Sequence, residues 1–194
     1  MKIRKRKFTI IELLVVVAII GVLMGMLLPA VTAVRQNARK TKAKSEINGI
    51  VTAIKQYEAT YGYFPFNSSP TTLANYRMLM EYLTNYPGPG NSASATTFVA
   101  NPRAQRFLDA PSTYGYNKGA IDTPSGASAW ATERGDYADP WGSFYQVYID
   151  ADYNGVVDTD IDTSLNGTVF VYSLGPDIKK GTTATNKDNI YSWK

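Results

Sequence analysis

The densest set of candidate ligand atoms lies between residues 150 and 162. Side chains that carry oxygen stand there at alternate positions around a central Gly155, and one position offers a backbone carbonyl instead. The set is Asp150, Asp152, Asn154, Val156, Asp158, Asp160 and Asp162. Hard oxygen ligands at alternating positions can curl around one Ca²⁺, and the glycine allows a sharp turn. The run therefore predicts a calcium-binding loop.

The spacing resembles an EF-hand loop but differs from it at the end. The twelfth position, normally a bidentate glutamate, is Ile161, so Asp160 or Asp162 would have to take its place. The alternative is a solvated acidic hairpin that turns at Asn154 and Gly155. We favour calcium, because neighbouring carboxylates with few cations between them would otherwise repel one another.

The composition excludes most other site chemistry. The chain has 194 residues and neither cysteine nor histidine. This removes disulfides, thiolate metal sites, the usual general base near neutral pH and the Ser/His and Cys/His nucleophile pairs. Paired carboxylates could still serve a membrane-anchored hydrolase that acts on glycans. The acids form an array rather than an isolated pair, so we predict a protein that is not an enzyme.

Two strands are predicted to flank the acidic run. The segment Asp139-Pro140-Trp141-Gly142 predicts a turn, and it leads into a strand over Phe144–Ile149 that is rich in aromatic and β-branched residues. A second strand is predicted over Thr168–Ser173. Two or three antiparallel strands packed on an amphipathic helix would make an α+β head.

A long helix is predicted from Thr9 to Tyr61. Its second half carries apolar residues at three- and four-residue steps, and Gly62 ends it. A short second helix is predicted over Leu73–Leu83. The stretch 87–136 is rich in Gly, Pro, Ser, Ala, Thr and Asn, and it predicts long loops with one short strand near Thr97–Val99.

The first half of the long helix is apolar, and a basic tail precedes it. Residues 13–31 would span about 28 Å as a helix, close to the thickness of a bilayer core. The tail would stay on the cytoplasmic side. A secretory signal peptide and a generic signal anchor are the alternatives. Glu12 is unusual in either, since a carboxylate one turn into a membrane segment costs several kcal/mol unless it is paired.

Residues 8–23, FTIIELLVVVAIIGVL, closely resemble the N-terminal signature of type IV pilins and type II secretion pseudopilins. The resemblance implies cleavage between Lys7 and Phe8 by a prepilin peptidase, with N-methylation of Phe8. It also implies that Glu12 pairs with the new N-terminal amine of an adjacent subunit. Pro29 falls where the family has a helix-bending or helix-melting proline. The family has glycine before the cleaved bond, whereas this chain has Lys7.

The far end of the chain resembles the major pseudopilins. Their calcium-binding loop has a counterpart in residues 173–177 followed by Asp188. By this resemblance Asp177 and Asp188 would be side-chain ligands, and Leu174 would donate a backbone carbonyl. The resemblance covers residues 1–84 and 139–193, so 87–136 is interpreted as an insertion.

The distribution of charge argues against nucleic-acid binding. Five of the twenty basic residues lie in the first seven positions, and the remaining chain has 15 basic and 16 acidic residues. A second basic cluster spans residues 35–44. It is either a solvated helix face near lipid headgroups or a set of ion-pairing partners for neighbouring subunits.

We therefore expect three parts: a basic leader peptide at 1–7, a transmembrane and filament-core helix at 8–34, and a periplasmic pilin-like head at 35–194. The expected function is that of a structural subunit of a type II secretion pseudopilus. The expected location is the inner membrane, crossed once, and the expected partners are further copies, minor pseudopilins and the prepilin peptidase. The alternative is the pilin of a surface pilus used for adhesion, motility or DNA uptake.

Overall fold

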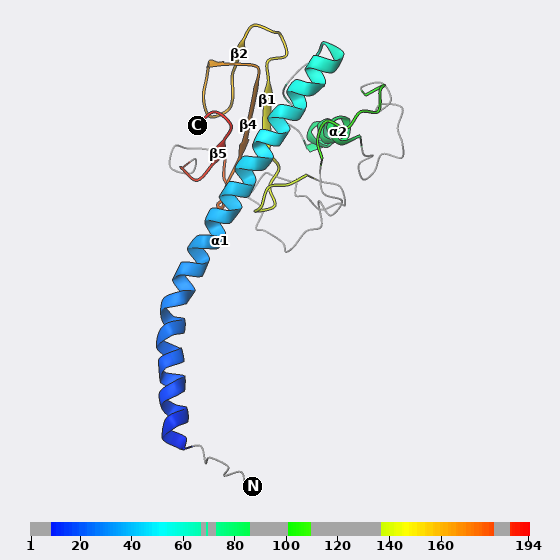
Figure 1. Cartoon of the computed structure of the whole chain (residues 1–194). Coiled ribbons are helices and arrows are strands. Elements are labelled where there is room, and N and C mark those ends of the chain that lie inside the picture. Colours follow the sequence, from blue (N-terminus) through cyan, green and yellow to red (C-terminus); the bar gives the residue numbers. More distant parts are fainter. Residues whose placement is uncertain (1–8, 67–68, 70–72, 86–100, 110–136, 181–186) are drawn as a thin grey trace, which may run out of the picture. The chain divides into compact units, whose positions relative to one another are not determined.

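The computed structural model describes residues 9–66, 69, 73–85, 101–109, 137–180 and 187–194 (Figure 1). The chain divides into two compact units, Met1–Arg39 and Lys40–Lys194. The predicted leader, the residues Lys7 and Phe8, and the predicted strand near Thr97–Val99 lie outside the described residues.

The long N-terminal helix is confirmed almost to the residue. Helix α1 runs from Ile10 to Tyr61 without interruption. It ends at Gly62, whose φ of 80° lies in the left-handed region that glycine adopts most readily. The amide of Gly62 donates to the carbonyl of Glu58 at 2.7 Å, which closes the last turn.

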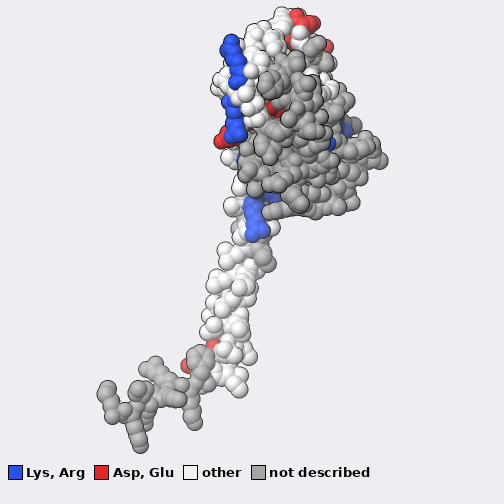
Figure 2. All heavy atoms as spheres, turned by 90° about the vertical axis from the view of Figure 1, so that its right-hand side faces the viewer, with Lys and Arg blue, Asp and Glu red and all other residues white. Residues whose placement is uncertain are grey.

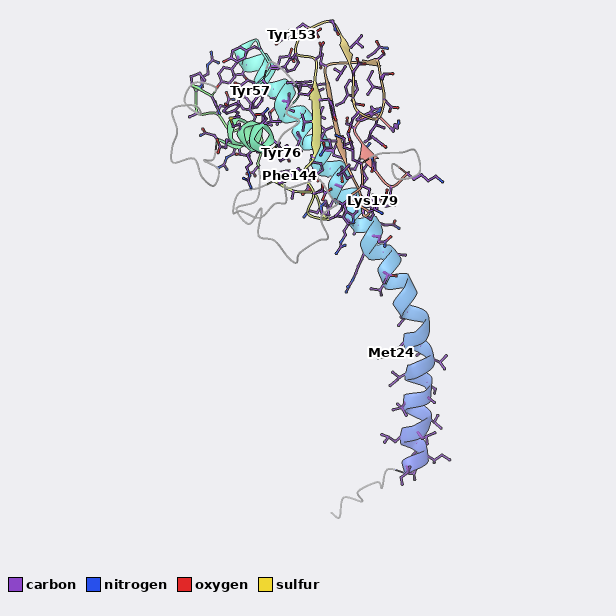
Figure 3. All side chains as sticks on the ribbon, turned by 180° about the vertical axis from the view of Figure 1, so that it is seen from behind. Met24, Tyr57, Tyr76, Phe144, Tyr153 and Lys179 are labelled. Carbon is purple, nitrogen blue, oxygen red and sulfur yellow. The ribbon has the colours of Figure 1, made fainter. Side chains whose placement is uncertain are left out.

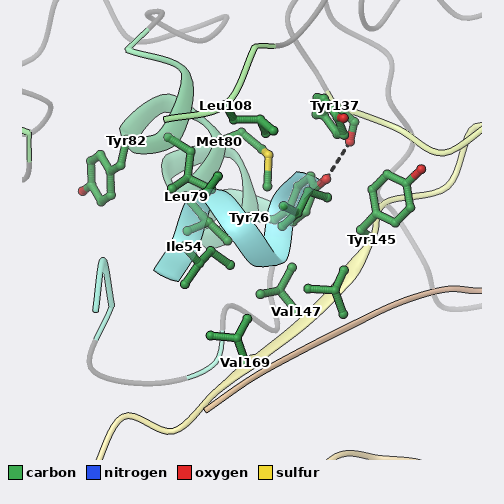
Figure 4. Packing of buried hydrophobic residues seen from close by; sticks show 14 of the residues in the cluster. Ile54, Tyr76, Leu79, Met80, Tyr82, Leu108, Tyr137, Tyr145, Val147 and Val169 are labelled. Carbon is green, nitrogen blue, oxygen red and sulfur yellow. Dashed lines mark hydrogen bonds between the residues drawn. The ribbon is translucent and has the colours of Figure 1, made fainter. Parts of the chain in front are cut away.

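The second unit is built on the apolar stripe of α1. Along this stripe Ile47, Ile50, Ile54 and Tyr57 are fully buried. Helix α2 (Leu73–Thr84) supplies Tyr76, Leu79 and Leu83 to the same core cluster. Figure 4 shows the packing of Ile54 among these residues, together with the hydrogen bond from the hydroxyl of Tyr76 to the carbonyl of Tyr137 at 2.8 Å.

The sheet is antiparallel and small. Its strand order is β1-β4-β5, and a separate two-stranded ribbon joins β2 to β3. The bounds are Gln146–Ile149 for β1, Val156–Val157 for β2, Leu165–Asn166 for β3, Val169–Ser173 for β4 and Ile190–Tyr191 for β5. The expected α+β fold, with a long N-terminal helix and a small antiparallel sheet, is confirmed.

Both faces of β4 are covered, each by a different layer. Val169 and Val171 belong to the core cluster that α1 and α2 share. Phe170 and Tyr172 belong to a second cluster that also takes in Trp193. Successive side chains of a strand point to opposite faces, so the central strand needs cover on both sides.

The element boundaries differ from the predictions in small ways. The strand predicted from Phe144 begins at Gln146, because Phe144 forms an isolated bridge with Ala138 instead. The strand predicted from Thr168 begins one residue later, and α2 extends one residue further than predicted. Strands β2, β3 and β5 were not predicted at all.

Part of the supposed insertion is packed into the head. The buried amide of Asn101 donates to the carbonyl of Tyr82 at 3.0 Å and to that of Gln105 at 2.8 Å. The backbone amides of Phe107 and Leu108 both donate to the carbonyl of Leu83. Residues 101–109 therefore form an ordered cover at the end of α2, where the sequence predicted only a loop.

A buried carboxylate fixes the turn that precedes β1. One oxygen of Asp139 accepts from the amides of Trp141 at 3.0 Å and Ser143 at 2.8 Å, and the other accepts from the hydroxyl of Ser173 at 2.5 Å. Asp139 is only 5% exposed. Burial raises its pKa to about 6, although these hydrogen bonds oppose the change.

This shift in pKa predicts that pH acts on stability through Asp139. The carboxyl stays protonated in the folded chain at pH values where it has ionised in the unfolded chain. Its contribution to the free energy of unfolding is therefore complete below pH 4 and is lost as the pH rises through 6. Two units of pKa correspond to about 3 kcal/mol. We therefore expect the free energy of unfolding to fall less between pH 4 and 7 in Asp139→Asn than in the wild type, with a difference of up to that amount. Urea denaturation measures it.

The matched control is Asp109→Asn, since the side chain of Asp109 is 91% exposed. It should leave the pH profile unchanged. Equal pH profiles for the wild type and Asp139→Asn would show that Asp139 does not titrate in this range.

Candidate assembly helix and calcium loops

The first part of α1 exposes apolar side chains on every side. Its large exposed residues are Ile10, Ile11, Leu13, Leu14, Val15, Val16, Val17, Ile19, Ile20, Val22, Leu23, Met24, Leu27, Val31 and Val34. Figure 2 shows this part of the helix as largely free of charge, and Figure 3 shows the Met24 side chain standing away from the helix axis. An apolar surface of this extent is typical of a segment that is buried by other molecules.

Within the helical residues that the structure describes, no stretch is both long and apolar enough to qualify as a membrane span. The membrane-crossing role predicted for residues 8–34 therefore stays a prediction.

Glu12 has a local role that the sequence analysis did not predict. Its carboxylate accepts from the amide of Thr9 at 2.8 Å and from the hydroxyl of Thr9 at 2.7 Å. In return the hydroxyl of Thr9 accepts from the amide of Glu12 at 3.3 Å. This reciprocal pair is a capping box at the start of α1. The spacing Thr-x-x-Glu in the sequence is a signal for this capping box. The pairing of Glu12 with a neighbouring subunit stays a prediction.

Pro29 does not end the helix, since α1 is continuous through residue 29. Its role in bending or melting the helix stays a prediction.

Two of the cations between residues 35 and 44 have partners within the head. The ammonium of Lys42 lies 3.8 Å from the carboxylate of Glu46, one helical turn further on. The ammonium of Lys44 donates to the backbone carbonyl of Tyr191, and to that of Lys194 at 2.9 Å. These two lysines therefore stabilise the head itself.

The first half of the acidic run folds as a tight turn. The carboxylate of Asp150 is buried and accepts from the amides of Asn154 at 3.1 Å and Gly155 at 2.8 Å. Asp152 accepts from the side-chain amide of Asn154 at 2.7 Å. The side-chain oxygen of Asn154 accepts from the backbone amide of Val156 at 2.7 Å. These oxygens therefore accept hydrogen bonds from donors within the same turn.

The second half of the run binds other parts of the head. Asp158 accepts from the amide of Ser164 at 2.7 Å. Asp160 accepts from the hydroxyls of Tyr148 and Tyr172 and pairs with the ammonium of Lys180. Asp162 has partners further along the chain, at residues 193 and 194.

The run therefore does not form one ligand shell in this conformation. Among the residues described, no three acidic side chains are grouped so that they could share a metal ion. Each acid of the run accepts a hydrogen bond from a protein donor. Calcium binding by residues 150–162 remains a prediction from the spacing alone.

The second candidate site brings the backbone of Asp177 next to the side chain of Asp188. The amide of Asp177 donates to the carboxylate of Asp188 at 3.1 Å, although the two are distant in the sequence. Leu174 is buried three residues before Asp177. Carboxylates and backbone carbonyls are the donors that a hard cation prefers, and calcium binding by Asp177, Asp188 and Leu174 stays a prediction.

Gly175 makes this approach possible. Its φ is 71°, and a Cβ atom built on it would lie 2.3 Å from the carbonyl oxygen of Asp188. The two backbone segments thus pass so closely that no side chain fits between them.

Two curated relatives align with almost the whole chain. The type II secretion system core protein G of Pectobacterium carotovorum subsp. carotovorum is 24% identical over 190 residues, which is 98% of this chain and 85% of the relative. The protein of that name from Klebsiella pneumoniae is 23% identical over 190 residues, covering 98% of this chain and 95% of the relative. The one from Pseudomonas aeruginosa is 33% identical over 85 residues, covering 43% and 56%.

These relatives support the resemblance of the chain to the type IV pilin and pseudopilin family. No protein-family model and no solved structure matches it. The expected family is nevertheless supported from two sides, by similarity along nearly the whole chain and by the long helix with its small antiparallel sheet.

The sequence analysis missed one residue that organises the head. Tyr153 has a φ of 57°, stacks on Phe64 with ring centroids 5.2 Å apart, and its hydroxyl accepts from the backbone amide of Phe64 at 3.0 Å. It ties the turn at 150–155 to the chain just beyond α1. Nothing in the local pattern marks Tyr153 for this role, because Phe64 lies far away in the sequence.

The close approach at Gly175 gives a direct test of the second site's geometry. We expect Gly175→Ala to destabilise the head by roughly 2 kcal/mol or more, because it combines left-handed strain with a steric clash. Gly62→Ala is the matched control, since Gly62 has a φ of 80° and no atom within 4 Å of the position that the new methyl group would take. It should cost about 1 kcal/mol. Thermal unfolding measures both, and equal losses would mean that the two segments are not in close contact.

Proposed function

We propose that this chain is a structural subunit of a type II secretion pseudopilus, polymerising through the first part of α1. The observation that carries the proposal is the similarity to type II secretion system core proteins G along nearly the whole chain. None of these relatives is named as an enzyme, and the role we propose is structural. Their names give no support to the alternative of a surface pilus.

The exposed part of α1 supplies the driving force for polymerisation. Each copy would bury its apolar residues between Ile10 and Val34 against the same residues of neighbouring copies, which removes a large apolar area from water or lipid. The head would remain on the outside of such a helix bundle. Arg35 and Arg39, which are exposed and follow the apolar stretch directly, would lie where ion pairs between subunits can form.

Before assembly, the chain would wait in the inner membrane. We place residues 8–34 in the bilayer and the head in the periplasm, after removal of the leader 1–7 by a prepilin peptidase. The fibre would contain further copies of this chain together with minor pseudopilins. The apolar stretch, the basic tail and the family resemblance support this arrangement.

Calcium at the second candidate site fits the residues present there. We propose that Asp177, Asp188 and the carbonyl of Leu174 hold one Ca²⁺, which would tie residues 174–178 to residue 188 in a head without disulfides. The support is the hydrogen bond from the backbone amide of Asp177 to the carboxylate of Asp188 and the closeness of the two backbones at Gly175.

Assembly is tested at Glu12. In a strain that lacks the native gene, we expect Glu12→Ala to reduce export of secreted proteins to background and to abolish fibres, because the partner of the neighbouring N-terminal amine is lost. Secreted activity in the medium and electron microscopy of fibres are the measurements. Intact-mass analysis checks that the variant still begins at Phe8.

Thr9→Ala is the matched control, because it removes the capping partner of Glu12 and keeps the carboxylate. It should cost about 1 kcal/mol of helix stability and leave export nearly normal. Export by Glu12→Ala at the wild-type level would contradict the role in assembly. Loss of twitching or DNA uptake with export intact would favour the surface pilus.

Calcium is tested by chelation. We expect EDTA to lower the melting temperature of the full chain in detergent by several degrees, and added Ca²⁺ to restore it. Asp188→Asn should have the lower melting temperature already and should not respond to EDTA. Asp152→Asn, in the other acidic run, serves as the control and should respond as the wild type does. A melting temperature that EDTA leaves unchanged in the wild type would contradict the calcium site.

A further inference from the structure

The chain contains the dipeptide Asn-Gly three times, at residues 48–49, 154–155 and 166–167. Asparagine before glycine is prone to deamidation in water, because glycine has no side chain to shield its amide nitrogen. That nitrogen attacks the side-chain carbonyl carbon of the asparagine, a C–N bond forms, and ammonia leaves with the proton of the glycine amide. Water then opens the cyclic imide to aspartate or isoaspartate. The reaction therefore needs a glycine amide and an asparagine side chain that are free to meet.

The first Asn-Gly lies inside a helix that the core holds in place. Asn48 and Gly49 belong to α1, and their neighbours Ile47 and Ile50 are fully buried. Inside a helix the backbone angles are fixed, and each amide is hydrogen-bonded to the carbonyl four residues earlier. The amide of Gly49 therefore cannot turn toward the side chain of Asn48 unless this part of α1 unfolds.

The reacting groups of the second Asn-Gly are all held by hydrogen bonds. The side-chain oxygen of Asn154 accepts from the amide of Val156 at 2.7 Å, and the side-chain nitrogen donates to Asp152 at 2.7 Å. The amide of Gly155 donates to the buried carboxylate of Asp150 at 2.8 Å. Hydrogen bonds with one ionised partner are stronger than neutral ones. The attack would have to break them and would place negative charge on the nitrogen beside a carboxylate, so the turn at 150–155 protects its own Asn-Gly.

The third Asn-Gly has far fewer restraints. Asn166 is exposed at the end of the two-residue strand β3, and among the described residues its side chain makes no hydrogen bond. The amide of Gly167 donates to the carbonyl of Gly155, a neutral acceptor, at 3.0 Å. A ribbon of two such short strands has little stability by itself. We therefore expect this hydrogen bond to open often by local unfolding.

The fold also requires the glycine at position 167. Its φ is 145°, and a Cβ atom built on it would lie 2.8 Å from the ring of Phe170. That ring is buried in the cluster that takes in Trp193. A larger residue after Asn166, which would slow the reaction, is therefore excluded by packing.

We propose that Asn166 is a site of spontaneous deamidation, and that the turn at 150–155 and helix α1 keep Asn154 and Asn48 intact. The product would place a new carboxylate on β3, and isoaspartate would lengthen the backbone between β3 and β4 by one carbon. The end of β1 is close by, since the amide of Asp150 donates to the carbonyl of Thr168 at 2.8 Å. The charge of the head would thus depend on the age of the subunit.

The test is peptide mapping by mass spectrometry of the purified full chain in detergent, sampled during storage at mildly alkaline pH. Conversion of an amide to an acid changes the peptide mass, and chromatography separates isoaspartate from aspartate. We expect Asn166 to convert at least roughly tenfold faster than Asn154, because at Asn154 about one more charged hydrogen bond has to open. Asn48 should stay intact. An unmodified Asn166, or equal rates at Asn166 and Asn154, would overturn the proposal.

Variants test the site and its protection separately. Asn166→Gln should keep the mass of its peptide, because glutamine would have to form a larger ring; a mass change that persists there would overturn the assignment. Asp150→Asn and the exposed variant Asp152→Ala should each speed conversion of Asn154. Asn48 reports whether the head is still folded in these variants, since it should convert only when α1 opens. Wild-type rates at Asn154 in both variants would show that these hydrogen bonds do not protect it.

Discussion

The head depends on the burial of one helical stripe. Ile47, Ile50, Ile54 and Tyr57 are fully buried, and they meet α2 on one side and the inner face of β1 and β4 on the other. The sheet is too small to support itself, since it consists of three short strands. Its strands therefore depend on packing against α1 for their stability.

The polar interactions of the head connect segments that the core alone leaves loose. Asp139 joins the turn before β1 to Ser173 in β4, and Asn101 joins its own loop to the end of α2. Tyr153 links the turn after β1 to Phe64. Each of these groups is buried or stacked, where an unsatisfied polar atom would be costly. Together they connect segments of the head in the way that disulfides do in many small secreted domains.

The predictions from sequence succeeded where the signal is local and repeated. The apolar period of α1 and the aromatic and β-branched runs of β1 and β4 extend over enough residues to show their element type. Strands β2, β3 and β5 have two residues each, too few for any period, and they exist because of their partners. The helix cap at Thr9 was readable from its spacing, whereas the role of Tyr153 depends on a residue far away in the chain.

The acidic run illustrates the limit most clearly, because its spacing is real but does not decide its use. A carboxylate at an alternate position serves equally well as a ligand for Ca²⁺ or as an acceptor for a lysine, an indole or a tyrosine hydroxyl. The choice depends on which donors the fold places nearby, and here Lys180, Trp193 and Lys194 arrive from the far end of the sequence. In the second region the carboxylate of Asp188 accepts from the backbone amide of Asp177, and that of Asp177 accepts from the backbone amide of Lys179. Spacing alone therefore could not reveal that the acids at 160 and 162 bind cations from a distant part of the chain.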